Sequence, residues 1–139
     1  MTEPSPTLEQ LEGETGGELE DDSYLVRTIH ALRRKPIAEF TIEDLRITLG
    51  QRKGIAHLLP LALDRLEADP FARGHIYPGD LLGAVMDIPA AYWQAHPSEA
   101  ARIARIADRA AQLLDGRPEI EEIKTHLRQL MAVRPWGAA

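Results

Sequence analysis

The 139-residue sequence contains no cysteine and few aromatic residues, which make up 5% of the chain. Without thiols the protein can form neither disulfides nor thiolate metal sites, which is compatible with a reducing compartment. No stretch of the sequence comes near the ~20 consecutive apolar residues that a membrane-spanning helix needs. The segment Met1-Thr2-Glu3-Pro4 has neither the basic start nor the apolar run of a secretory signal. These absences predict a protein that stays in the cytoplasm.

The sequence also lacks the motifs on which catalysis and cofactor binding commonly depend. It has no Gly-rich phosphate loop followed by Lys and Ser or Thr, no His-Glu-x-x-His and no paired cysteines. None of its five histidines belongs to a recognisable metal-binding motif. We therefore expect no catalytic residue, no metal site and no cofactor, and hence no enzyme.

The net charge of −6 is concentrated at one end of the chain. Residues 1–22 contain eight acidic residues and no basic one, whereas the other 117 residues carry 14 acidic and 16 basic residues. This asymmetry predicts an acidic, partly flexible N-terminal arm over residues 1–22, followed by one helical domain over residues 23–139. The arm could attract a basic partner by long-range electrostatic steering, or it could be a solvated tail that aids solubility.

Apolar residues recur at helical spacing between start and stop signals. Thr7 could cap a short helix that docks on the body, Ser23 could cap the next helix, and Thr41 has the spacing of a capping box. Residues 55–66 are apolar on almost every side, which is typical of a central buried helix, and Pro60 predicts a kink or a split within it.

The second half of the chain has helix start and stop signals of the same kind. Asp80 is placed to cap a short helix over residues 81–87, a further short helix holds Tyr92 and Trp93, and Ser98-Glu99 opens the longest element. The last two helices carry apolar residues at one shared spacing: Ile103, Ile106, Ala110, Leu113 and Leu114, then Ile120, Ile123, Leu127, Leu130 and Met131. The sequence therefore predicts an all-α fold, a compact single-domain bundle of six to eight helices that ends in an antiparallel αα-hairpin.

A basic cluster, Arg33-Arg34-Lys35, could contact phosphate groups. Nucleic-acid-binding domains usually have a strongly basic body with reading elements, whereas this body has a formal charge of only +2. We favour a helix end at which the basic side chains complement the negative pole of the helix dipole.

Several segments, taken in order, carry a resemblance to a known family. They are Ala31-Leu32-Arg33-Arg34-Lys35-Pro36, Thr41-Ile42-Glu43-Asp44-Leu45-Arg46, Leu59-Pro60-Leu61-Ala62 and Tyr77-Pro78-Gly79-Asp80-Leu81-Leu82. In this register, over about residues 7–95, the chain resembles the helical immunity proteins of bacterial contact-dependent growth inhibition (CDI) systems. It departs from that pattern at His75-Ile76, where the family would place an acidic residue and an aromatic one.

The resemblance implies an antidote that binds and neutralises the toxin domain at the C-terminus of a large exported effector. Such toxins are often nucleases, particularly tRNA-cleaving ones, and present a basic cleft. From the charge asymmetry we expect the toxin contact on Glu18, Glu20, Asp21 and Asp22, with Asp80 in the loop. Tyr77 is a further expected contact, because it lies beside Pro78-Gly79 in the same loop. The partner would be this protein domain, with no direct nucleic-acid or membrane contact.

Two other interpretations stay open at this point. The chain could be a non-catalytic helical adaptor that acts through self-association or partner binding at its terminal hairpin. It could also be a small hydrolase or metal enzyme built around His75, Tyr77 and Asp80. The sequence leaves the oligomeric state open, with a monomer favoured.

Overall fold

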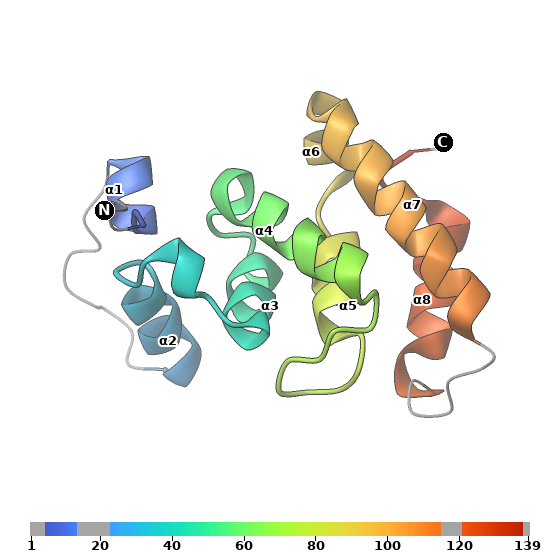
Figure 1. The fold of residues 1–139 in the computed structure, drawn as a ribbon, viewed down its shortest axis with the longest axis horizontal. Coiled ribbons are helices and arrows are strands. Elements are labelled where there is room, and N and C mark those ends of the chain that lie inside the picture. The colour runs from blue at the N-terminus through green and yellow to red at the C-terminus, as the bar shows by residue number, and fades with distance from the viewer. Residues whose placement is uncertain (1–4, 14–22, 115–120, 138–139) are drawn as a thin grey trace.

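The computed structural model describes residues 5–13, 23–114 and 121–137, which form eight α-helices and one short 3-10 helix (Figure 1). The helices follow one another along the long axis of the molecule, with α1 and α2 at one end and α7 and α8 at the other (Figure 1). Their bounds are α1 Leu8–Glu12, α2 Tyr24–Leu32, η1 Ile37–Glu39, α3 Ile42–Gly50, α4 Ile55–Ala68, α5 Asp80–Met86, α6 Ala90–Ala95, α7 Pro97–Leu113 and α8 Glu121–Val133. Within the described ranges there is no strand, so the predicted all-α class is confirmed.

The predicted helix caps at Thr7, Ser23 and Thr41 are all present. The Ser23 hydroxyl accepts a hydrogen bond from the amide of Val26 at 3.2 Å. Thr41 and Asp44 form a reciprocal capping box, in which each side chain accepts a hydrogen bond from the other residue's amide, at 3.1 and 3.0 Å. These caps satisfy amides that the first helical turn leaves without partners, which is why the helices begin where they do.

The first helix is docked on the body of the protein. Leu8 is fully buried, and the amide of Glu9 donates to the carbonyl of Arg33 at 3.1 Å. Glu12 forms an ion pair with Arg33 at 2.7 Å, and Glu9 forms one with Arg34 at 3.3 Å. Of the predicted acidic arm, residues 5–13 are therefore attached to the helical body, and Arg33 and Arg34 after α2 are paired with acidic residues of α1.

Helix α4 is continuous through Pro60, so of the kink or split predicted there the split does not occur, and the kink stays a prediction. Proline cannot donate to the carbonyl of Ala56, but both residues are exposed, and that carbonyl can be hydrated. The helix is also less completely buried than its composition indicated. Its buried residues form one face, and the other face is exposed to solvent at Asp64, Arg65 and Glu67.

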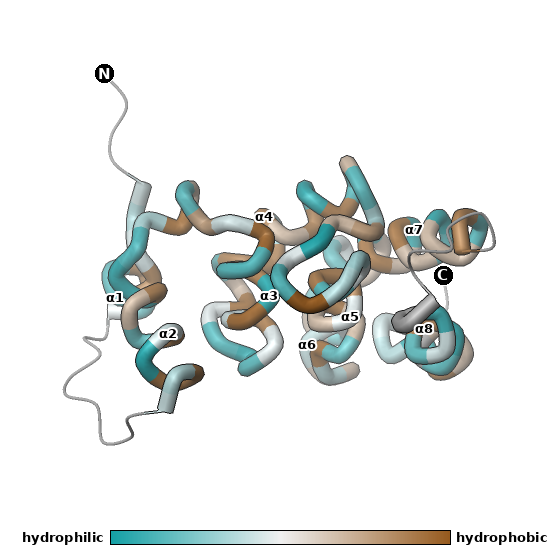
Figure 2. Tube along the Cα trace, turned by 90° about the horizontal axis from the view of Figure 1, so that it is seen from below, coloured by the Kyte–Doolittle hydropathy of each residue, from teal (hydrophilic) through white to brown (hydrophobic). Residues whose placement is uncertain are grey.

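The centre of the molecule is a layer of three helices. Helix α3 packs against α5 and α4, and α4 also contacts α5 and α7. Hydrophobic and hydrophilic residues alternate along the traces of these helices (Figure 2). One continuous hydrophobic core runs through the described chain from Leu8 in α1 to Trp136 after α8. This core fixes the ends of the long connection between α4 and α5.

The C-terminal helices close the other end of the molecule. Helix α8 contacts both α5 and α7, and Arg134 after it pairs with Asp108 of α7 at 3.1 Å. Trp136, 5% exposed, lies beside the first half of α7, where the chain returns over that helix. The antiparallel αα-hairpin stays a prediction, because the turn predicted at Gly116-Arg117 lies outside the described residues. None of the helices in the described ranges combines the length and apolar composition needed to cross a membrane.

Candidate functional site

The structure describes two of the six residues that the sequence placed in the partner contact. Tyr77 and Asp80 belong to the loop that connects α4 with α5, whereas Glu18, Glu20, Asp21 and Asp22 lie outside the described residues. The loop projects from the body between α3 and α5 (Figure 1). An isolated antiparallel bridge between Arg73 and Pro78 narrows it into a hairpin-like shape.

Asp80 holds the loop from inside, although it was expected to cap α5. The helix begins at Asp80 itself, Gly79 is its N-cap residue, and no side chain caps it. The side chain of Asp80 is 2% exposed, and its carboxylate accepts hydrogen bonds from the amides of Gly74 at 2.7 Å and Ile76 at 3.0 Å. Asp80 therefore folds the loop backward onto the start of α5, and its burial prevents direct contact with a partner in this conformation.

A second anchor joins the loop to α3. The guanidinium of Arg46 donates to both carboxylate oxygens of Glu43 at 2.6 Å and lies 3.7 Å from Asp80. The same Glu43 carboxylate accepts a hydrogen bond from the amide of His75 at 2.9 Å. The bond from Arg46 lowers the pKa of Glu43, and this effect outweighs the opposing effect of burial. Glu43, Arg46 and Asp80, which we call the loop anchor, thus form one charge-assisted network.

Gly74 is required by the closeness of this packing. A Cβ atom at this position would lie 2.6 Å from Oε1 of Glu43 and 3.0 Å from Oδ2 of Asp80. The first distance is shorter than carbon and oxygen tolerate without displacement, and Glu43 is held on both sides by Arg46 and His75. The loop conformation and the absence of a side chain at residue 74 therefore depend on each other.

The two faces of the loop differ. Tyr77 is half-buried and packs against the hydrophobic core, so its ring supports the loop from within. By contrast, the side chain of His75 is 75% exposed, Ile76 is 55% exposed, and Arg73 is also exposed. The anchored loop presents one cationic, one imidazole and one apolar side chain to solvent.

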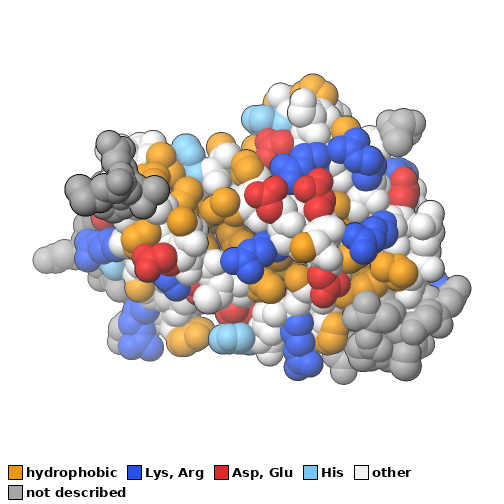
Figure 3. Space-filling model, in the orientation of Figure 1, with side chains coloured by type: hydrophobic (Ala, Val, Ile, Leu, Met, Phe, Trp, Pro, Cys, Tyr) orange, Lys and Arg blue, Asp and Glu red, His pale blue; other side chains and the backbone are white. Residues whose placement is uncertain are grey.

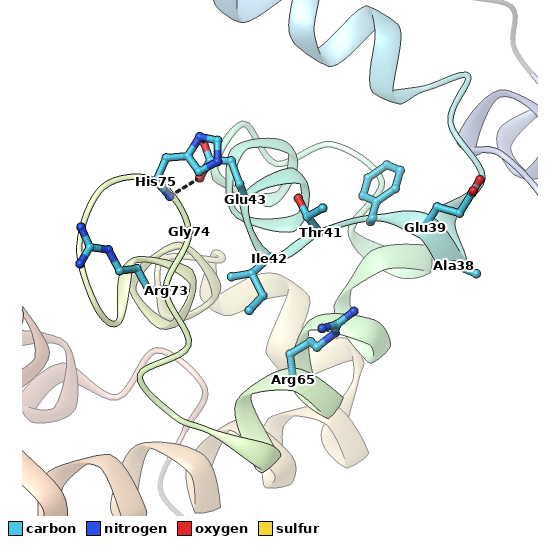
Figure 4. A pocket seen from close by; sticks show the side chains of 10 residues that line it. Ala38, Glu39, Thr41, Ile42, Glu43, Arg65, Arg73, Gly74 and His75 are labelled. Carbon is cyan, nitrogen blue, oxygen red and sulfur yellow. Dashed lines mark hydrogen bonds and ion pairs between the residues drawn. The ribbon is translucent and has the colours of Figure 1, made fainter.

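A hollow of about 480 Å³ lies beside this loop. Its lining comes from the segment before and at the start of α3, from α4 and from the loop: Ala38, Glu39, Phe40, Thr41, Ile42, Glu43, Arg65, Arg73, Gly74 and His75. Figure 4 shows Ile42 between Arg65 on α4 and Arg73 on the loop, with Glu39 pointing away from all three. We call this the central hollow.

The charges around the central hollow are not balanced by pairs. Neither Arg65 nor Arg73 has an ion-pair partner among the described residues, whereas Glu43 is neutralised by Arg46. Several other arginines of the described chain do form ion pairs; Arg102 of α7, for example, binds Glu67 at 2.6 Å and Asp64 at 2.8 Å. Figure 3 shows such mixed acidic and basic side chains over α4 and α7.

Sequence reasoning identified the loop but missed most of what anchors and surrounds it. The spacing of Glu43 and Arg46, three residues apart on a helix, was a readable signal for an ion pair. The contact between Glu43 and His75 joins residues 32 positions apart, and nothing local indicates it. Arg65 carried no signal, because only the folded chain brings it to the hollow.

The comparisons with known proteins add one finding. The family model described as CDI immunity proteins matches residues 10–103, about two-thirds of the chain, from α1 to the first half of α7. The matched range contains the loop anchor and the central hollow. The search of curated proteins and the search of solved structures each gave no match. Among the described residues, no group of three or more His, Asp or Glu is arranged to hold a metal ion.

Proposed function

Since this chain belongs to the CDI immunity protein family, we propose that it protects its cell by binding the cognate CDI toxin domain in a stoichiometric complex. CDI immunity proteins are non-catalytic toxin inhibitors. Inhibition then requires a surface that covers or distorts the active site of the toxin, and it requires no reactive group on this chain. The observation that carries the proposal is the family match across residues 10–103.

We further propose that the toxin is a nuclease and that the acidic arm contacts its basic cleft. The distribution of charged residues along the sequence supports this. Glu9 and Glu12 of α1 are matched by Arg34 and Arg33. Residues 14–22 contain five further acidic residues and no basic one: Glu14, Glu18, Glu20, Asp21 and Asp22. A cleft that binds nucleic acid is basic, so this surplus is complementary to it and would accelerate association.

In the proposed site, Tyr77 and Asp80 stabilise the conformation of the loop. Both are withdrawn from solvent, Asp80 almost completely, and each holds the loop against the body. A loop that is already fixed loses less conformational entropy on binding than a free one, which strengthens the complex. The proposal places the complex in the cytoplasm, where the toxin would act.

The required affinity sets the scale of the interface. An antidote present at low copy number must bind at nanomolar concentration or tighter, about −12 kcal/mol. Such complexes commonly bury about 800 Å² on each partner. The accessible surface of this chain is 7912 Å², so the toxin would cover about a tenth of it.

Co-expression with the toxin domain encoded directly upstream tests this function. Cells that produce the toxin should grow when this protein is present and stop growing when it is absent. Native mass spectrometry should show a 1:1 complex of the two purified proteins. Growth arrest despite abundant folded protein would refute the proposal, and a stable self-dimer without toxin affinity would favour an adaptor.

A further inference from the structure

The α4–α5 loop is held by buried contacts, but the side chains at its tip are exposed and do not pack in the core. Asp80 is buried to bind the loop amides, Glu43 is committed to His75 and Arg46, and residue 74 must be glycine. The exposed side chains of the loop contribute little to the core, since His75 and Ile76 are mostly exposed. A rigid loop with an exposed apolar side chain is suited to binding, because such a side chain gains burial only when a partner covers it.

The charges beside the loop define the chemistry of that partner. Arg65 and Arg73 are exposed and lack ion-pair partners among the described residues, and both line the central hollow. Of the two acidic residues that line the hollow, Glu43 is bound by Arg46, and the carboxylate of Glu39 is turned away from Arg65 and Arg73 (Figure 4). An acidic segment lying across the hollow would therefore meet two exposed guanidinium groups, one on each side of Ile42 (Figure 4), and each can bind a carboxylate with paired hydrogen bonds.

From this geometry we propose that the central hollow and the loop tip (Arg73, His75 and Ile76) bind an acidic segment of the toxin domain. Arg65 and Arg73 engage its carboxylates, and Ile76 packs against an apolar side chain beside them. This inference rests on the proposed function and adds a second contact, opposite in charge to the acidic arm. The two contacts would bind a toxin surface on which a basic cleft adjoins an acidic region.

The test compares toxin binding by full-length variants, using isothermal titration with the toxin domain. The double variant Arg65→Glu/Arg73→Glu should weaken binding at least 100-fold, and the milder Arg65→Gln/Arg73→Gln at least tenfold. The matched control is Arg105→Glu, because Arg105 is an exposed arginine of α7 that lines a different hollow. It should bind within threefold of wild type. The glutamine pair keeps the test valid if charge reversal perturbs helix α4.

The apolar contact has its own matched pair. Ile76→Ser should weaken toxin binding about tenfold, since it removes the side chain that the partner covers. Val133→Ser is the control, because Val133 is even more exposed, at 75%, and lies at the end of α8. It should leave the affinity unchanged. The free energy of unfolding should be similar in both variants and wild type.

The outcomes separate this inference from the proposed function. If wild type binds the toxin tightly and both arginine pairs bind equally well, the inference is wrong and the proposed function stands. If wild type does not bind the toxin at all, the proposed function itself fails. The inference is also overturned if the hollow joins two copies of this chain. In that case wild type would be a dimer, and the variant Arg65→Glu/Arg73→Glu would be a monomer. The inference is likewise overturned if the two arginine double variants lose affinity for an RNA oligonucleotide while they still bind the toxin as wild type does.

Discussion

The substitution Asp80→Asn examines the loop anchor most directly. Both oxygens of Asp80 accept hydrogen bonds, Oδ1 from Gly74 at 2.7 Å and Oδ2 from Ile76 at 3.0 Å. The side chain of asparagine has only one acceptor oxygen, so its NH₂ group must face the N–H group of either Gly74 or Ile76. Both of these groups are donors, and the hydrogen bond to that amide is lost. The ion pair with Arg46 at 3.7 Å is lost as well.

The size of the effect follows from these contacts. A hydrogen bond to a charged group contributes about 1.5–3 kcal/mol, and an unsatisfied buried donor costs about 1–3 kcal/mol. The loop can relax and admit water, so we expect a net loss of about 3 kcal/mol. In a domain of this size that corresponds to a fall in Tm of about 10 °C.

Urea unfolding followed by circular dichroism measures the loss. Hydrogen exchange should show that the amides of Gly74 and Ile76 lose protection first, because Asp80 is their acceptor. Asp87→Asn is the matched control, since Asp87 is half-exposed and lies 3.6 Å from His126. It should change stability by no more than about 0.5 kcal/mol. A loss below about 1 kcal/mol for Asp80→Asn, with unchanged exchange at both amides, would refute this account of the loop.

Three further predictions follow from the described contacts and from the acidic arm. Because Arg46 lowers the pKa of Glu43 in the folded state, this carboxylate stabilises the protein above its ordinary pKa, and that contribution disappears as the pH falls through the folded value. The difference in unfolding free energy between wild type and Glu43→Gln should therefore shrink between pH 6 and about pH 3, and a constant difference would contradict the assignment. Leu8→Ala should cost about 3 kcal/mol by urea unfolding, since Leu8 is fully buried under α1; a cost near zero would show that α1 does not dock in solution. Neutralising the acidic residues of segment 14–22 to their amides should slow toxin association severalfold at low salt and much less at 0.5 M salt, in stopped-flow measurements; equal rates at both salt concentrations would exclude steering by the arm.

Helix positions were largely predictable because local chemistry determines them. The capping box of Thr41 and Asp44 is a pattern of four consecutive residues, and the structure has it as predicted. At Pro60 the sequence predicted a kink or a split, and the split does not occur because the position of Pro60 on the exposed face lets the unpaired carbonyl reach water. The burial of α4 was overestimated because composition does not show which face of a helix a fold covers.

The site was less predictable because its defining contacts are long-range. Pro78-Gly79 before Asp80 marked a turn and a helix start, but not which amides the carboxylate of Asp80 would bind. The pairing of His75 with Glu43 and the position of Arg65 beside the loop both require the packing of α3 against α4 and α5. Local spacing carries no information on such packing.

The central claim is that this protein inhibits the toxin by occupying it. A titration of toxin activity against increasing amounts of this protein, at concentrations far above Kd, tests it most directly. The account predicts that activity falls linearly and reaches zero at one molecule of this protein per molecule of toxin. Full toxin activity at a tenfold excess, or inactivation of many toxin molecules by each molecule of this protein, would contradict it.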